Sequence, residues 1–329
     1  MKSLVRSFLV GAAFSLTVAS SFTFHLNPIA DLQAMWHYQF MQHAFEGGTL
    51  IAILAGITGY FVVLRRSAFA AHAFGDVGFA GAAGIVLVSQ PPIEGLLGAT
   101  ILAALAIAGL GGRASNRSTQ IGIVTAFALG LGLLFISLYT GNITEAYSIL
   151  FGEILAISTS ALYITLYGCI LVFAALAFLY RPLLFASLDE DVAEAKGLPM
   201  LFLGTAFMVI VAVAVSFSIQ VTGVLLIFSL MVTPAATAAY LSKKPQLTIL
   251  ISVAIALAVT WSGIFISFYT PYPVSFFITA EAFGLYVLVR VISSALKFRV
   301  RMADDKAQRL LNKPPSDSTP GLNAAEPEP

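Results

Sequence analysis

The sequence is dominated by long apolar runs that are separated by short polar segments. Nine such runs lie at roughly 46–64, 74–89, 93–111, 121–139, 160–180, 201–219, 220–241, 247–268 and 273–292. Several come close to the ~20 apolar residues with which a helix spans a bilayer. The runs are continuous rather than alternating, which does not fit the strands of a membrane β-barrel. We therefore expect an all-α, polytopic transmembrane helical bundle with about nine main helices, preceded by one further hydrophobic segment.

The two ends of the chain differ from this pattern. Residues 1–33 form an N-terminal hydrophobic segment, in which Lys2 and Arg6 precede an apolar run and small residues follow it. This arrangement fits a cleaved signal peptide and an extra transmembrane helix equally well, and both alternatives stay open. Residues 34–298 form the transmembrane domain, whereas residues 299–329 turn abruptly polar. Such a composition predicts a cytoplasmic, largely disordered tail, helical at most around Asp304 to Leu311 and disordered beyond Pro314.

Basic residues indicate how the bundle is oriented. They gather in every second loop, whereas the intervening loops 27–46, 89–94, 140–158 and 270–273 contain no Lys or Arg. Cytoplasmic loops carry the excess of Lys and Arg in membrane proteins. We therefore expect a multi-pass protein of the cell (cytoplasmic) membrane with its C-terminus in the cytoplasm. The basic loop residues are Arg65 and Arg66, Arg113 and Arg117, Arg181, Lys196, Lys243 and Lys244, and Lys297 to Arg301.

Composition excludes several other classes of protein. The chain is 59% hydrophobic and 10% charged, with a net charge of +1, so it has no basic field for nucleic acid. Its one cysteine, Cys169, cannot form an intramolecular disulfide. No Gly-Lys dipeptide occurs, so the chain lacks the phosphate loop of a P-loop ATPase.

One apolar run contains an imidazole and a carboxylate. In the stretch LRRSAFAAHAFGDVGFAGAAG, His72 and Asp76 are four residues apart, so a helix places both on one face. A carboxylate at the centre of a membrane helix costs about 2.5–3.5 kcal/mol, so such residues usually face a cavity or a partner. Borderline divalent metals accept both ligand types. The pair is predicted either to bind a metal ion on a transport path or only to form a hydrogen bond within itself.

The same run carries a glycine repeat. Gly75, Gly78, Gly81 and Gly84 recur at every third position. Small residues let helix backbones approach closely in lipid. We therefore expect this helix to pack tightly against a neighbour.

Two further residues in apolar runs bear on function. Glu281 lies in the last run, where its burial requires a partner, and it ranks second to the pair as a candidate metal ligand. Pro234 lacks a backbone N–H and is predicted to kink or divide the helix that contains it. Broken helices in transporters often flank the path of the substrate.

A charged segment interrupts two apolar runs on the predicted cytoplasmic side. In FASLDEDVAEAKGLPM the acidic residues suit the first turn of a short helix, and Gly and Pro end it. The segment is either a capped connecting helix or a coupling helix that docks into a cytoplasmic subunit. Its candidate coupling residues are Asp189, Glu190, Asp191, Glu194, Gly197 and Pro199.

Four stretches of the chain, taken in order, resemble one protein family. They are FMQHAFEGGTLIAILAGITGYFVVLRR, LFGEILAIS at 150–158, SLDEDVAEAKGLPM, and QVTGVLLIFSLMVTPAATA at 220–238. These stretches are similar to those of the membrane subunits of zinc, manganese and iron ABC importers. The resemblance covers about residues 35–292.

This resemblance implies a permease of the vitamin-B12-importer-like architecture that works as a homo- or heterodimer. Its partners would be a cytoplasmic ABC ATPase dimer, which contacts residues 189–199, and an extracytoplasmic metal-binding protein. ATP hydrolysis would belong to the ATPase, so the chain itself would not be an enzyme. The cargo would be a divalent ion, with zinc or manganese favoured and iron as the third candidate, and no cofactor would be bound permanently.

The chain departs from the family at the pair. Family members often have Asp-x-x-x-His in a pattern like DALSHAALPG, whereas this chain has HAFGDVGFAG, so His72 and Asp76 stand in the exchanged order. The exchange keeps one imidazole and one carboxylate at the same spacing. An alternative function is a proton-coupled secondary metal carrier that works without an ATPase, with Asp76 or Glu281 as the proton site.

Overall fold

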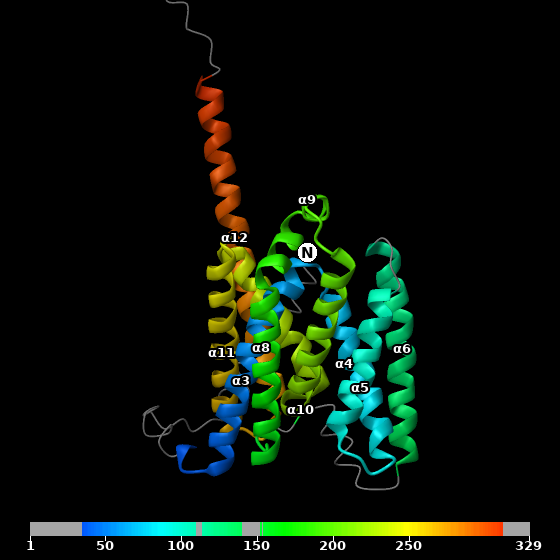
Figure 1. Cartoon of the computed structure of the whole chain (residues 1–329). Helices are drawn as coiled ribbons and strands as arrows, with labels where there is room; N and C mark the ends of the chain where they lie inside the picture. Colours follow the sequence, from blue (N-terminus) through cyan, green and yellow to red (C-terminus); the bar gives the residue numbers. More distant parts are fainter. Residues whose placement is uncertain (1–34, 110–113, 140–151, 153, 312–329) are drawn as a thin grey trace, which may run out of the picture.

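The computed structural model describes residues 35–109, 114–139, 152 and 154–311. Every regular element in these ranges is a helix (Figure 1). The predictions for residues 1–33, and for the tail beyond Leu311, lie outside the described residues. The helices are α3 (Gln39–Leu64), α4 (Ala68–Val86), α5 (Pro92–Gly109), α6 (Ala114–Leu138), α8 (Thr159–Leu188), α9 (Glu190–Ala195), α10 (Met200–Leu241), α11 (Pro245–Phe268) and α12 (Val274–Leu311).

Helix α10 consists of two arms. Its 42 residues would measure about 63 Å if straight, twice the ~30 Å of the hydrocarbon core. Gly223 interrupts it with φ 76° and ψ 168°. In the first arm, the ring of Phe207 lies under the guanidinium of Arg65, with the Cζ atom of Arg65 5.2 Å from the ring centroid. In the second arm, Ala235 packs against Gly59. Arg65 and Gly59 lie at the same end of α3, so the chain reverses direction at Gly223.

The nine predicted apolar runs correspond to eight helices that are long and apolar enough to cross a membrane within the described residues. The numbers differ because runs 201–219 and 220–241 are the two arms of α10. The backbone leaves helical geometry at Gly223, so Pro234 lies inside the second arm without dividing it. The combination of φ and ψ at Gly223 is accessible essentially to glycine alone.

Two helix boundaries differ from the sequence-based expectation. Helix α4 begins at Ala68 rather than near residue 74, because His72 interrupts the apolar run but not the helix. Helix α12 continues without a break to Leu311, so the helix expected around Asp304 to Leu311 is joined to the last membrane helix rather than separate from it. Neither Gly nor Pro occurs between residues 285 and 311 to end the helix.

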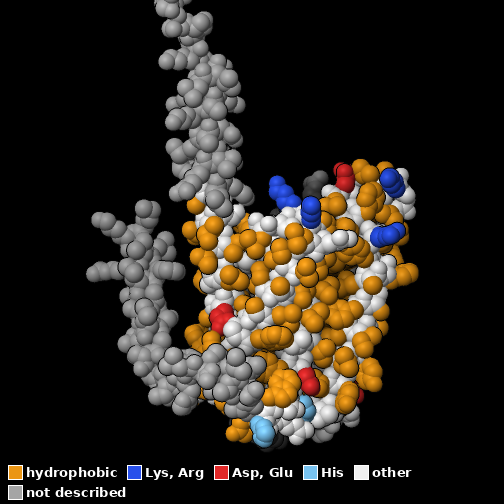
Figure 2. Space-filling model, turned by 90° about the vertical axis from the view of Figure 1, so that its left-hand side faces the viewer, with side chains coloured by type: hydrophobic (Ala, Val, Ile, Leu, Met, Phe, Trp, Pro, Cys, Tyr) orange, Lys and Arg blue, Asp and Glu red, His pale blue; other side chains and the backbone are white. Residues whose placement is uncertain are grey.

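Helix α10 joins the two halves of the bundle. On one side α3 packs against α8 and α11, and on the other side α4 packs against α5 and α6. Both halves contact α10, which lies between them in Figure 1. Figure 2 shows hydrophobic side chains over the middle of one face, Lys and Arg at one end of the bundle, and His at the opposite end. This distribution agrees with a membrane-spanning arrangement, and the end with Lys and Arg is the one that the sequence predicts to face the cytoplasm.

Candidate metal-ion site

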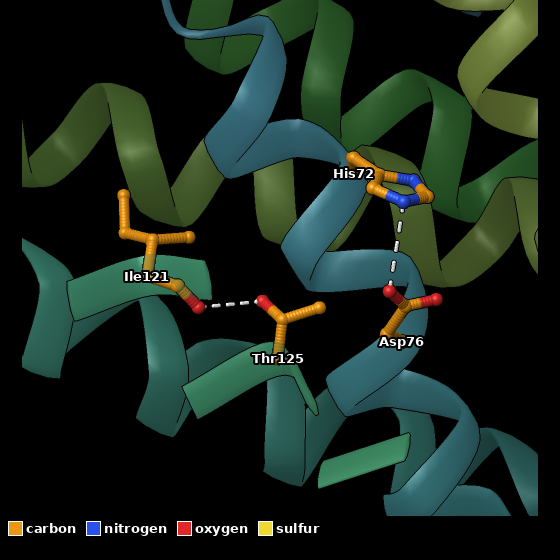
Figure 3. Close-up of polar contacts among 4 residues, drawn as sticks. All are labelled: His72, Asp76, Ile121 and Thr125. Atoms are coloured by element: carbon orange, nitrogen blue, oxygen red, sulfur yellow. Dashed lines mark hydrogen bonds and ion pairs between the residues drawn. The ribbon is translucent and has the colours of Figure 1, made fainter. Parts of the chain in front are cut away.

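Helix α4 carries both members of the predicted pair. Their spacing places His72 one turn from Asp76 on the same face (Figure 3). The Nε2 atom of His72 and the Oδ2 atom of Asp76 are 3.6 Å apart. The side chain of His72 is 44% exposed and that of Asp76 only 12%. The imidazole therefore borders open space, whereas the carboxylate is set into the bundle.

The surroundings of the pair are mostly apolar. The ring of His72 lies against Phe228 in the second arm of α10, with centroids 4.9 Å apart. The buried Nδ1 atom of His72 has no hydrogen-bond partner among the described residues. Thr125 of α6, also drawn in Figure 3, donates its hydroxyl to the carbonyl of Ile121 at 2.7 Å. The hydroxyl of Thr125 is thus directed at its own helix. Among the described residues, the polar partner of Asp76 is the imidazole of His72.

In this geometry the two side chains could hold a divalent cation between them. An ion between the two side chains would bind one nitrogen and one oxygen, for which zinc bonds measure about 2.0–2.2 Å. No group of three or more His, Cys, Asp or Glu side chains that could hold a metal occurs in the part of the chain that the structure describes. A two-ligand site leaves other coordination positions to water or to another chain. It suits an ion that must leave again.

The glycine repeat of α4 faces three neighbouring helices. A Cβ atom at Gly75 would lie 3.3 Å from a side chain of α10, at Gly78 3.0 Å from α5, and at Gly84 3.1 Å from α6. At Gly81 it would meet the backbone carbonyl of Gly95 on α5. Helix α4 is therefore in backbone contact with α5 at Gly81, and it packs tightly against side chains of its neighbours at the other three glycines.

Glu281 lies apart from the pair. It belongs to α12, whose main packing partners are α10 and α11. The hydroxyl of Ser262 on α11 donates a hydrogen bond to its carboxylate. The structure thus provides the partner that a glutamate at this depth requires, but it does not bring Glu281 together with His72 and Asp76.

The charged segment predicted to be cytoplasmic folds as the short helix α9 at one end of the bundle (Figure 1). Asp189 caps it, because its Oδ1 atom accepts a hydrogen bond from the N–H of Val192 at 3.0 Å. Gly197 ends it with φ 79°. The buried Ala193 packs with Ala186 and Leu203, which fixes α9 to α8 and α10. The predicted coupling residues all lie on the exposed side of the segment.

Sequence reasoning missed three residues that shape these sites. Phe228 and Ser262 come from helices distant in sequence, and no local pattern marks them as neighbours of His72 and Glu281. The break at Gly223 could have been predicted from the sequence. The apolar stretch 201–241 is too long for one membrane crossing, and Gly223 is the one glycine after the first turn of that stretch.

Comparisons with known proteins agree with this architecture. A family model described as the ABC 3 transport family matches residues 37–293. The manganese import system permease protein ScaB of Streptococcus gordonii is 29% identical over 283 residues, which cover 86% of this chain and 97% of that protein. The high-affinity zinc uptake system membrane protein ZnuB of Buchnera aphidicola subsp. Schizaphis graminum is 31% identical over 174 residues, 53% of this chain and 67% of that protein.

A solved structure shows the same fold. The structure described as PsaBC from Streptococcus pneumoniae in complex with Fab has a TM-score of 0.72 and 25% sequence identity, and the match covers 79% of this chain and 94% of that one. Together with the eight candidate spans, this likeness confirms the expected all-α, vitamin-B12-importer-like bundle.

Proposed function

The chain belongs to the ABC 3 transport family, and from this premise we propose that it is the permease subunit of an ABC importer for a divalent transition-metal ion. Manganese and zinc are the favoured cargoes because relatives are described as manganese and zinc transport proteins. Iron remains the third candidate. The chain is a membrane permease rather than an enzyme, and hydrolysis of ATP belongs to a partner ATPase.

The observation that carries the proposal is the His72–Asp76 pair within the candidate membrane span Ala68–Val86. The metal ion passes the pair and binds it transiently, because one imidazole and one carboxylate hold a borderline divalent ion without enclosing it. A second permease subunit supplies the remaining ligands across the dimer. Glu281, with its serine partner on another face, is a weaker candidate for contact with the ion.

The energy for transport enters through α9. Its exposed acidic face, which includes Glu190, Asp191 and Glu194, docks into the cytoplasmic ATPase. The buried contact of Ala193 with α8 and α10 transmits the movement of the ATPase to both helices. An extracytoplasmic metal-binding protein delivers the ion to the opposite end of the bundle.

Uptake of radiolabelled manganese and zinc into proteoliposomes tests the proposal. We expect uptake that requires ATP, the cognate ATPase and the binding protein. Uptake by this chain alone under a proton gradient would instead establish the secondary carrier.

Variants of the pair test the site itself. His72→Ala and Asp76→Asn are expected to lower uptake on the order of 10–100-fold, the range seen when groups around a metal are removed. His37→Ala is a matched control, because His37 is exposed and lies before α3. Normal uptake by both pair variants at equal membrane levels would reduce His72 and Asp76 to a structural pair.

A further inference from the structure

A groove runs along one side of the bundle between α8 and α11. Both helices pack on α3 but have at most a marginal contact with each other, so α3 forms the floor and they form the walls. In Figure 1 the three helices stand side by side with α3 between the other two. A hollow of about 740 Å³, lined by Trp36, Tyr163 and Trp261 among others, opens at the predicted extracytoplasmic end. A second hollow of about 640 Å³, lined by Phe178 and Arg181 among others, opens at the cytoplasmic end.

The two hollows belong to one groove. On α8, Tyr163 and Arg181 are 18 residues apart, which is five helical turns, so they lie on the same face about 27 Å apart. Ile170 lies between them on that face and is 54% exposed. On α11, Gln246 and Trp261 are close to four turns apart. The groove therefore extends over nearly the ~30 Å thickness of a hydrocarbon core.

Contacts to the floor hold the walls apart. The indole N–H of Trp261 donates to the hydroxyl of Thr49 on α3 at 2.9 Å. On the other wall, the ring of Tyr180 stands edge-on to Phe61 of α3, with centroids 5.9 Å apart. Both walls are thus anchored to α3, and the groove is a preformed feature of the bundle. Its lining is mostly apolar, with His43 and Glu46 at one end and Arg181 and Gln246 at the other.

The described part of the chain begins at the mouth of this groove. Met35, the first described residue, is fully buried, and its neighbour Trp36 lines the extracytoplasmic hollow. Upstream, residues 7–24 contain no charged side chain, and as a helix these 18 residues would measure about 27 Å, the length of the groove. Lys2 and Arg6 precede them and belong on the cytoplasmic side.

We propose that residues 7–24 form a membrane helix that lies in the groove between α8 and α11. In this position Lys2 and Arg6 lie at the cytoplasmic hollow, and residues 25–34 return the chain to Trp36. The segment is rich in small residues, among them Gly11, Ala12 and Ala13. Small residues let a helix approach closely, which suits a groove whose walls carry large aromatic side chains. The segment is consequently retained in the mature protein as part of the permease.

Disulfide cross-linking of the full chain tests this placement. In a Cys169→Ser background, cysteine is placed at each of positions 16 to 19 in turn and combined with Ile170→Cys, which lies at the same depth in the groove. The matched control replaces the partner by Leu102→Cys on α5, which is 69% exposed on the other half of the bundle. After mild oxidation in membranes we expect an intramolecular cross-link with Ile170→Cys at one or two of the four positions and none with Leu102→Cys.

The mass of the intact purified chain completes the test. A mature protein that starts after residue 19 would overturn the proposal, because the segment would then have been cleaved as a signal peptide. A retained segment without cross-links to Ile170→Cys would overturn it as well and leave lipid as the occupant. Cross-links that join two chains rather than one would assign the groove to a second copy.

Discussion

Gly152 and Gly223 meet backbone to backbone at the turn of α10. Both have a positive φ, 75° and 76°, and a Cβ atom on Gly152 would lie 2.6 Å from the backbone nitrogen of Gly223. Gly152 precedes α8, so the contact ties the start of that helix to the point at which α10 reverses. Two sequence stretches that the family resemblance had singled out separately, LFGEILAIS and QVTGVLLIF, are thus parts of one contact.

The first prediction concerns Gly223. Gly223→Ala is expected to destabilise the folded chain by about 1–3 kcal/mol, because its φ and ψ are strained for any residue with a Cβ atom. The measurement is the midpoint of thermal unfolding in detergent. Gly204→Ala in the same helix is the control, since a Cβ there meets no atom within 4 Å. Equal midpoints for both variants would show that the reversal tolerates a side chain.

The second prediction concerns the contact between α4 and α5. Gly95→Ala should destabilise the chain by about 1–3 kcal/mol, because its Cβ would press on the backbone of Gly81. Gly98→Ala, one turn further along α5, is expected to be neutral or stabilising, since it faces open space. Thermal unfolding and the yield of monodisperse protein compare the two. A loss of yield with Gly98→Ala but not with Gly95→Ala would contradict the packing described here.

The third prediction uses the exchanged order of the pair. The double variant His72→Asp with Asp76→His keeps one imidazole and one carboxylate four residues apart. We expect it to retain more metal uptake than His72→Asp alone or Asp76→His alone. The first of these leaves two carboxylates and the second leaves two imidazoles. Rates of uptake at saturating ATP, normalised to membrane level, provide the comparison. A double variant as inactive as the single ones would show that the order of the two ligands matters as well as their identity.

The fourth prediction separates capping from docking at α9. Asp189→Ala removes the hydrogen bond to the N–H of Val192 and should cost about 0.5–2 kcal/mol of local helix stability. Asp189→Ser keeps a capping oxygen without the charge and is expected to restore copurification with the ATPase. Glu190→Gln combined with Glu194→Gln leaves the cap intact and should weaken copurification through lost charge. If Asp189→Ser does not restore copurification although α9 is still folded, Asp189 contacts the ATPase directly.

The fifth prediction concerns the hydrogen bond between Ser262 and the carboxylate of Glu281. Ser262→Ala removes the donor to its carboxylate, and leaving a polar group without its partner costs about 1–3 kcal/mol. Glu281→Gln is expected to be milder, because a neutral amide needs less compensation in an apolar setting. Thermal unfolding ranks the variants. A Glu281→Gln chain less stable than the Ser262→Ala chain would indicate that the charge itself has a further partner.

Much of the fold follows from local sequence. The continuous apolar runs determine helices of bilayer length, and the Lys and Arg positions determine which ends lie together, because both effects act on each segment by itself. The spacing of His72 and Asp76 likewise fixes that they share a face, since an isolated helix imposes it.

Other features depend on which helices become neighbours. The contact of His72 with Phe228, the serine that pairs with Glu281, and the groove between α8 and α11 each join residues far apart in the chain. The reversal at Gly223 lies between these cases: the length of the apolar stretch required a break, but Gly152 and the packing of both arms on α3 show where the chain turns. The sequence by itself determined the helices and the shared face of His72 and Asp76, because these arise from interactions over one or two turns. Only the tertiary structure decided the surroundings of the pair and the shape of the groove, because they arise from packing between helices.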